Sequence, residues 1–173
     1  MKIVIKGGRE FVGEVLKKKF INSEYTIHTI GRSSHFTKSD LPANCQHHCC
    51  DLANDPIPED IFKGADLIFH IAAKAGVWGK YTDFYSSNVT ATRNILSACK
   101  KYRINKLIYT STPSVVFSGQ PIVNGSESLP YGNSGLSAYA ETKTIAEREI
   151  LEANESQKLQ TIALRPHLIW GEG

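Results

Sequence analysis

Short apolar runs alternate with amphipathic stretches along the whole chain. Six runs have the length and apolar content of buried strands, and they cover residues 2–6, 25–31, 46–52, 66–73, 106–112 and 160–165. Longer stretches with helical spacing separate some of them, over residues 11–20, 88–102 and 137–154. This alternation predicts an α/β fold, with a doubly wound parallel sheet between two layers of helices.

The helical stretches also predict which side chains face the sheet. In residues 11–20 one face carries Phe11, Val12, Val15, Leu16 and Phe20, whereas Lys17, Lys18 and Lys19 are expected in solvent. In residues 88–102 the buried stripe is expected to hold Val89, Thr92, Leu96 and Cys99. Ser137 is placed to cap the helix that follows it.

Composition narrows the class of protein. A chain of 173 residues with 41% hydrophobic and 21% charged residues fits a single domain with one core over residues 1–173. A net charge of +3 does not favour a nucleic-acid partner. No apolar run is long enough to span a membrane and no signal peptide is evident, so a cytoplasmic location is expected.

The four cysteines are expected to be free thiols, because their spacing does not form a disulfide framework. The run CQHHCC at residues 45–50 contains possible metal ligands, but neighbouring side chains of a strand point to opposite faces. No second cluster completes a tetrahedral set, and we therefore predict no metal site.

A glycine turn follows the first strand and leads into the first helix. Gly7 permits a tight turn, Gly8 follows it, and Gly13 would allow the helix to pack closely on the sheet. The free N–H groups at the start of the helix, around Phe11 and Val12, can bind an anion such as a pyrophosphate. Such a turn can also be merely a turn.

Glu10 occupies the position where such turns usually carry a middle glycine. Its carboxylate would repel a pyrophosphate, and Lys6 and Arg9 would offset part of this repulsion. We expect the carboxylate to point into the helix N-terminus, where an anion is stabilised.

The ends of the second, third and fourth strands carry further candidates. Arg32 could bind the 2′-phosphate of NADP, which favours NADP over NAD, or could be a solvated arginine. Asp51 could accept a hydrogen bond from an adenine amino group with Leu52 against the ring, or could be a loop residue. The small residues Ala72 and Ala73 would let a cofactor approach the backbone.

A possible catalytic pair lies on the last helix. Tyr139 and Lys143 are four residues apart and share a helical face, and the lysine would favour the phenolate of the tyrosine. A tyrosine with a lowered pKa can donate a proton to the oxyanion that forms when a carbonyl is reduced. A hydroxyl from Ser111 or Thr112, at the end of the fifth strand, would steady the same oxygen.

Several tracts together resemble the extended short-chain dehydrogenase/reductase superfamily, which includes the NAD-dependent epimerases and dehydratases. They are HIAAKAGVWGKY, NVTATRNILSAC, KLIYTSTPSVVFSG, ESLPYG, YAETK and LRPHLIWGEG. Within it the chain is similar to the 3β-hydroxysteroid dehydrogenase branch, and especially to bacterial sterol dehydrogenase-like proteins and 2-alkyl-3-oxoalkanoate reductases. This resemblance implies a Rossmann fold that binds NADP or NAD.

The resemblance also implies roles for individual residues. Tyr139 is the acid/base, Lys143 bonds the nicotinamide ribose and lowers the pKa of Tyr139, and Thr112 orients the reacting oxygen. Further cofactor contacts are implied for Ala72, Ala73, Lys74, Asn88, Pro166 and His167. The implied reaction is hydride transfer between the cofactor and a secondary alcohol or ketone on a bulky apolar small molecule, sterol-like or 3-oxo acyl.

Two departures from the family leave alternatives open. The turn reads KGGREFVG where the family usually has Thr-Gly-Gly-x-Gly-Phe-x-Gly, so both the threonine and the middle glycine differ. Family members also continue into a C-terminal substrate-binding region that is absent here, and exposed apolar surface would then favour a homo-oligomer. The alternatives are a truncated or degenerate relative acting as a binding module, and a sugar-nucleotide epimerase or dehydratase.

Overall fold

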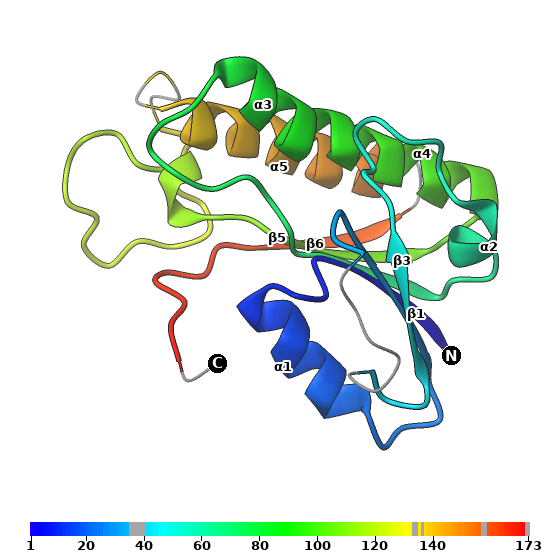
Figure 1. The fold of residues 1–173 in the computed structure, drawn as a ribbon. Coiled ribbons are helices and arrows are strands. Elements are labelled where there is room, and N and C mark those ends of the chain that lie inside the picture. The colour runs from blue at the N-terminus through cyan, green and yellow to red at the C-terminus, as the bar shows by residue number, and fades with distance from the viewer. Residues whose placement is uncertain (35–40, 133–134, 136, 157–158, 172–173) are drawn as a thin grey trace.

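One parallel sheet of six strands forms the centre of the computed structural model, which describes residues 1–34, 41–132, 135, 137–156 and 159–171. Its strands are β1 (Lys2–Lys6), β2 (Thr26–Gly31), β3 (Cys45–Cys49), β4 (Leu67–His70), β5 (Lys106–Thr110) and β6 (Gln160–Leu164). They lie in the order β3-β2-β1-β4-β5-β6 (Figure 1). The chain thus builds outward from β1 in one direction and then from β4 in the other, which confirms the doubly wound sheet.

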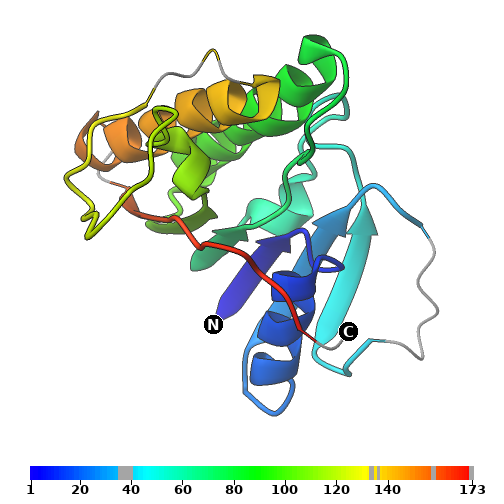
Figure 2. The same cartoon turned by 90° about the vertical axis from the view of Figure 1, so that its left-hand side faces the viewer.

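Helices cover both faces of the sheet (Figures 1 and 2). On one face lies α1 (Phe11–Phe20), and on the other lie α3 (Tyr81–Tyr85), α4 (Ala91–Tyr102) and α5 (Ala138–Ser156). The short α2 (Glu59–Phe62) joins β3 to β4. The three layers agree with the sequence prediction.

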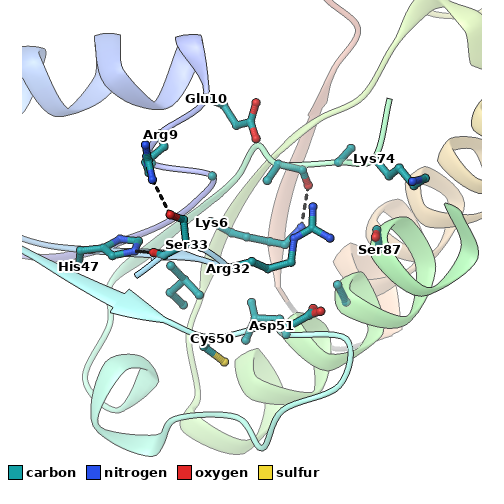
Figure 3. Close-up of a pocket in the computed structure, with 18 residues that line it drawn as sticks. Lys6, Arg9, Glu10, Arg32, Ser33, His47, Cys50, Asp51, Lys74 and Ser87 are labelled. Atoms are coloured by element: carbon teal, nitrogen blue, oxygen red, sulfur yellow. Dashed lines mark hydrogen bonds between the residues drawn. The ribbon is translucent and has the colours of Figure 1, made fainter. Parts of the chain in front are cut away.

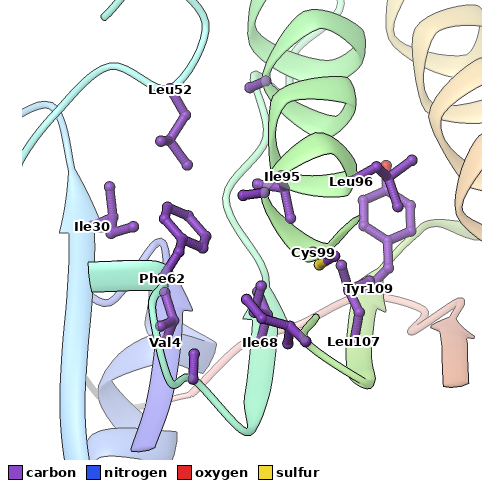
Figure 4. Packing of buried hydrophobic residues seen from close by; sticks show 14 of the residues in the cluster. Val4, Ile30, Leu52, Phe62, Ile68, Ile95, Leu96, Cys99, Leu107 and Tyr109 are labelled. Atoms are coloured by element: carbon purple, nitrogen blue, oxygen red, sulfur yellow. The ribbon is translucent and has the colours of Figure 1, made fainter. Parts of the chain in front are cut away.

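Alternation along the strands divides the core into two clusters. Val4 of β1 points to the layer of α4 and α5, where it packs in a large cluster with Ile68, Ile95 and Tyr109 (Figure 4). Its neighbours Ile3 and Ile5 point the other way, towards Val12, Leu16 and Phe20 of α1. A strand with buried residues on both faces, such as β1, must lie inside the sheet.

The inner face of α1 differs from the predicted one. Phe11 and Val15 were expected in the core but are 39% and 52% exposed, because the inner face of α1 runs through positions 12, 13, 16, 17 and 20. Lys17 was expected in solvent but is buried, and its ammonium forms an ion pair with Glu14 at 2.7 Å. The long aliphatic part of the side chain lets a lysine occupy such a position.

The predicted helix over residues 88–102 is regular only from Ala91. Residues Ser86–Thr90 form a single π-helical turn between α3 and α4. The predicted stripe of Val89, Thr92, Leu96 and Cys99 is buried as expected. At the start of α5, the Ser137 hydroxyl accepts a hydrogen bond from the Ala140 N–H, which confirms the predicted cap.

The four cysteines are free thiols. Within the described part of the chain, no cluster of three or more His, Cys, Asp or Glu side chains is arranged to hold a metal ion. None of the helices described is long and apolar enough to cross a membrane.

Candidate functional site

A cleft of about 280 Å³ opens at the carboxyl ends of β1, β2, β3 and β4 (Figure 3). The parallel strands all end at this edge, so residues distant in sequence meet there. Of the predicted cofactor residues, the cleft brings together Gly7, Gly8, Glu10, Arg32, Asp51, Leu52, Ala72, Ala73 and Lys74. Lys6 and Arg9, which were expected to offset the charge of Glu10, also line the cleft. Sequence reasoning did not assign to the site the further lining residues Ile30, Gly31, Ser33, His47, Cys50, Ser87 and Ala91.

The glycine turn is sterically constrained. Gly7 has a φ of +93°, and a Cβ there would lie 2.6 Å from the backbone nitrogen of Ala72. A Cβ at Gly13 would lie 2.1 Å from the carbonyl oxygen of Gly7. Both distances are far below van der Waals contact, so no side chain fits at either position. This confirms the predictions that Gly7 permits a tight turn and that Gly13 allows close packing. Phe11, Val12 and Gly13 lie behind the turn and do not line the cleft.

Glu10 precedes α1 with an extended backbone, and its side chain forms no capping hydrogen bond with the helix. The expectation that its carboxylate points into the helix N-terminus is therefore wrong. The Glu10 carbonyl instead accepts the Glu14 N–H, while the exposed side chain lies at the rim of the cleft (Figure 3). The backbone places the carboxylate over the cleft rather than back on the helix.

Arg9 links the glycine turn to the end of β2. Its Nη1 donates a hydrogen bond to the Ser33 hydroxyl at 2.7 Å. His47 of β3 lies 2.9 Å through Nε2 from the Ser33 carbonyl oxygen. Arg32, next to Ser33, is exposed and lines the same part of the cleft. Two guanidinium groups therefore border one end of the cleft, whereas the sequence analysis proposed only Arg32 as the partner of a 2′-phosphate.

Asp51 and Leu52 follow β3 with different environments. Leu52 is 2% exposed and joins the large core cluster as well as the cleft wall. The Asp51 carboxylate accepts hydrogen bonds from the Ala53 N–H and the Asn54 amide, each at 3.0 Å. Asp51 thus stabilises its own turn, as the loop interpretation predicted, while also lining the cleft.

Asn88 does not line the cleft but holds its wall in place. Its Oδ1 accepts a hydrogen bond from the Lys74 N–H at 2.7 Å, and its Nδ2 donates to the Lys74 carbonyl at 3.1 Å. The same Nδ2 donates to the Thr142 hydroxyl on α5 at 3.0 Å. Asn88 therefore ties the loop after β4 to the helix that carries Tyr139 and Lys143.

Tyr139 and Lys143 lie outside this cleft, on α5. Lys143 is 1% exposed, donates a hydrogen bond from Nζ to the Thr110 carbonyl at 2.7 Å, and lies 4.1 Å above the ring of Tyr109. Burial, and then the charge of Lys6, lower the pKa of Lys143 to about 7, against an opposing effect of Glu147. Burial at the end of β5 therefore disfavours the charged form of Lys143.

Thr112 caps a short 3₁₀ turn, Pro113–Val115, and its hydroxyl accepts a hydrogen bond from the Ser114 N–H at 3.3 Å. It also donates to the Ser114 hydroxyl at 3.2 Å. Pro166 and the exposed His167 follow β6, two strands from the cleft. The structure therefore does not bring Thr112, Pro166 or His167 into the cleft.

Glu147 was missed by sequence reasoning. It is fully buried one helical turn after Lys143 and forms an ion pair with Arg165 at the end of β6. The Tyr131 hydroxyl donates a hydrogen bond to it at 3.0 Å. Burial raises the pKa of Glu147, but the hydrogen bonds from Arg165 and other donors outweigh it and lower the pKa overall. The spacing of four from Lys143 was the available sequence signal.

The chain matches the 3-beta hydroxysteroid dehydrogenase/isomerase family over residues 4–173. It is 38% identical to a 2-alkyl-3-oxoalkanoate reductase of Shewanella oneidensis, over 96% of this chain and 44% of the relative. It is 34% identical to a decarboxylating sterol-4-alpha-carboxylate 3-dehydrogenase of Mus musculus, over 98% of this chain and 46% of the relative. The chain thus spans about half the length of these curated relatives.

Solved structures of epimerases share the fold of this chain. The fold superposes on a UDP-glucuronic acid 4-epimerase from Bacillus cereus in complex with NAD, with a TM-score of 0.86 and 27% identity over 99% of this chain and 57% of the other. A UDP-N-acetylglucosamine 4-epimerase from Methanobrevibacter ruminantium gives a TM-score of 0.83 and 27% identity, over 95% and 54%. The glycine turn and the doubly wound sheet are consistent with the family match over residues 4–173. The chain therefore belongs to the 3-beta hydroxysteroid dehydrogenase/isomerase family.

Proposed function

We propose that this chain forms the nucleotide-binding part of an NAD(P)-dependent oxidoreductase. The observation that carries the proposal is the cleft at the carboxyl edge of the sheet, where the glycine turn, Arg32, Asp51 and Ala72 meet. Such a crevice beside the first strand of a doubly wound sheet is where dinucleotides bind.

The residues of the cleft fit a dinucleotide. Gly7 packs directly against the backbone of Ala72, and both residues line the cleft, so a ligand there would meet two backbone segments. The lining carries four basic and two acidic side chains, an excess of positive charge that suits a pyrophosphate: Lys6, Arg9, Arg32 and Lys74 against Glu10 and Asp51. Leu52 and Ala91 offer apolar surface to an adenine ring.

NAD(P), when bound, supplies hydride chemistry, and the chain's own residues would manage the proton. We assign to Tyr139 the donation of a proton to the carbonyl oxygen, or its removal from the alcohol. Lys143 follows Tyr139 by four residues on α5, and we assign to it a hydrogen bond to the nicotinamide ribose. Thr112 would orient the same oxygen by exchanging its bond to Ser114.

A preference for NADP over NAD is part of the proposal. Arg32 and Arg9 border one end of the cleft, and Arg9 is held there by Ser33. Guanidinium groups bind phosphate with paired hydrogen bonds. A 2′-phosphate on the adenosine ribose is the group that would distinguish the two cofactors at this end.

The substrate proposed is a bulky apolar molecule with a secondary alcohol or ketone, by similarity to relatives named as an oxoalkanoate reductase and a sterol dehydrogenase. A second candidate is sugar-nucleotide epimerisation, which is favoured by the likeness to epimerases at TM-scores of 0.83 and 0.86. Net consumption of NADPH with a ketone would favour the first, whereas interconversion of UDP-sugars without net change in the cofactor would favour the second.

Titration with NADPH and NADH tests the proposal. We expect NADPH to quench the intrinsic tryptophan fluorescence or raise the melting temperature, and to bind more tightly than NADH. Arg32→Ala should weaken NADPH binding about tenfold and NADH binding little, as the loss of one charged hydrogen-bonding partner is worth about 1.4 kcal/mol or more. Arg148→Ala, at an exposed position on α5, is the matched control. Failure of both cofactors to bind would refute the proposal.

A further inference from the structure

Lys6 is a charged residue at the end of a central strand. It directly precedes Gly7, and its side chain lies on the same face of β1 as Val4, between the sheet and the layer of α4 and α5. It lines the cleft, and its Nζ donates a hydrogen bond to the Ala72 carbonyl at 2.7 Å (Figure 3). The ammonium group therefore lies between the two backbone segments that form the floor of the cleft.

The hydrogen bond found for Lys6 is to a neutral carbonyl, although an ammonium group has three N–H donors. Charged and titratable groups face it from five other parts of the fold: Arg32 after β2, Asp51 after β3, Glu10 in the glycine turn, His70 on β4 and Lys143 on α5. Among the described residues, the two carboxylates act on Lys6 through charge alone. A partly buried cation without a hydrogen-bonded counterion is costly, and an anionic ligand would relieve that cost.

Burial, and then the charge of Arg32, lower the pKa of Lys6 to about 8, against the opposing charges of Asp51 and Glu10. A phosphate in the cleft would act as a third negative group and raise this pKa again. Near pH 8 the side chain is therefore about half-protonated without ligand and would be fully protonated beside a phosphate.

We propose that the Lys6 ammonium binds a phosphate of the nucleotide directly, and that Lys6 takes up a proton from solution when the nucleotide binds. The inference rests on the proposed function, because it requires that the cleft accept a nucleotide. The positive charge of Lys6 would then offset the repulsion between the Glu10 carboxylate and a phosphate bound at the glycine turn.

Calorimetric titration with NADPH at pH 8 tests this, in two buffers with different ionisation enthalpies. The wild type should take up about half a proton more per site than Lys6→Met, because a group at its pKa is half-protonated. Lys6→Met should weaken both NADPH and ADP about tenfold, a typical loss for one charged hydrogen bond, and leave adenosine unchanged. Lys6→Met also removes a charge that lowers the pKa of Lys143. The titration is therefore repeated with Lys143→Met and with the double variant, where the difference in proton uptake isolates Lys6.

Two further variants make the test decisive. Lys2→Met is the matched control, since Lys2 lies on the same face of β1 at the other end, where its Nζ bonds to the Asp60 carbonyl. Lys6→Thr, which is smaller and suits a strand, replaces Lys6→Met if that variant does not fold. Equal proton uptake by wild type and variant, or equal weakening of adenosine and NADPH, would overturn the inference while leaving nucleotide binding intact. Absence of NADPH binding to the wild type would instead refute the proposed function.

Discussion

Asn88 and Lys74 are joined by two hydrogen bonds that run in opposite directions, at 2.7 Å and 3.1 Å. The amide of Asn88 thereby satisfies both backbone groups of a loop residue, as a neighbouring strand would. One buried side chain thus fixes the loop after β4, which forms a wall of the cleft.

Asn88→Ala should destabilise the fold by about 2–3 kcal/mol, because it removes the hydrogen bonds of Asn88 to the Lys74 N–H, the Lys74 carbonyl and the Thr142 hydroxyl. Urea unfolding measures the loss. Asn94→Ala on the neighbouring turns of α4 is the control, since Asn94 donates one hydrogen bond to the Leu52 carbonyl and its removal should cost about 1 kcal/mol. Equal losses of unfolding free energy in the two variants would show that the pair of hydrogen bonds to Lys74 adds nothing to stability.

A pH dependence of stability is expected from His28 and His48. Their Nδ1 and Nε2 atoms are 2.9 Å apart on neighbouring strands. Burial, followed by the charges of Lys2 and His48, lowers the pKa of His28 to about 4, against an opposing effect of Asp60. Burial likewise lowers the pKa of His48. Two protonated rings could not share this hydrogen bond.

Because the pKa of His28 is lower in the folded chain than the usual 6.5, the native state binds fewer protons than the unfolded state between these values. Its contribution to stability is therefore complete above about pH 6.5 and is lost as the pH falls towards 4. We expect a loss of about 1–2 kcal/mol at pH 5 relative to pH 7, measured by urea unfolding. His28→Gln should flatten this dependence, whereas the exposed His167→Gln should not.

Glu10→Gly should tighten NADPH binding about five- to tenfold, because a carboxylate about 4 Å from a phosphate costs about 1 kcal/mol in water and more when partly buried. Glu10→Gln, which removes the charge but keeps the bulk, separates repulsion from steric hindrance. Glu14→Gln is the control, as Glu14 lies on α1 and does not line the cleft. Unchanged affinity in both Glu10 variants would show that the carboxylate does not reach the ligand.

Tyr139→Phe should abolish ketone reduction while changing the dissociation constant of NADPH less than twofold or so, since it removes only the acidic hydroxyl. Turnover and fluorescence titration measure the two effects separately. Tyr85→Phe is the control, because the Tyr85 hydroxyl accepts a hydrogen bond from Arg93 at the surface of α3. Retained turnover in Tyr139→Phe would assign proton transfer to another group.

Self-association is expected through β6. This strand ends the sheet, and its Ile162 and Leu164 are 54% and 52% exposed. An apolar strand at an open sheet edge favours pairing with another chain. Leu164→Lys should lower the apparent mass in light scattering, and Val123→Lys, at an 80% exposed loop position, should not. A wild type that remains monomeric at high concentration would contradict this.

The sequence was most informative about the sheet. Continuous apolar runs define the strands, and the side chains that follow each strand must meet at one edge, which is why Gly7, Arg32, Asp51 and Ala72 were predicted together. The burial of Lys17 could not be predicted, because helical spacing assigns it to solvent and its low exposure depends on how α1 packs in the fold.

Other parts of the site depend on conformations that residue type does not determine. The direction of the Glu10 side chain follows from the backbone of the turn, and the link between Arg9 and Ser33 joins residues 24 positions apart. The bond from Lys6 to Ala72 likewise depends on the pairing of β1 with β4. Such contacts cannot be predicted from the sequence, because they form only between segments that folding brings together.

Asn88 lies in the π-helical turn Ser86–Thr90, so the direction of its side chain depends on the number of residues in that turn. A π turn accommodates one more residue than an α-helical turn, so deleting one residue there would rotate everything on its N-terminal side by about 100° relative to α4. Asn88 could then no longer bond to both Lys74 and Thr142, even if every other residue were unchanged. In a protein engineered from this scaffold, the length of this segment would therefore be as strict a requirement as the identity of its side chains.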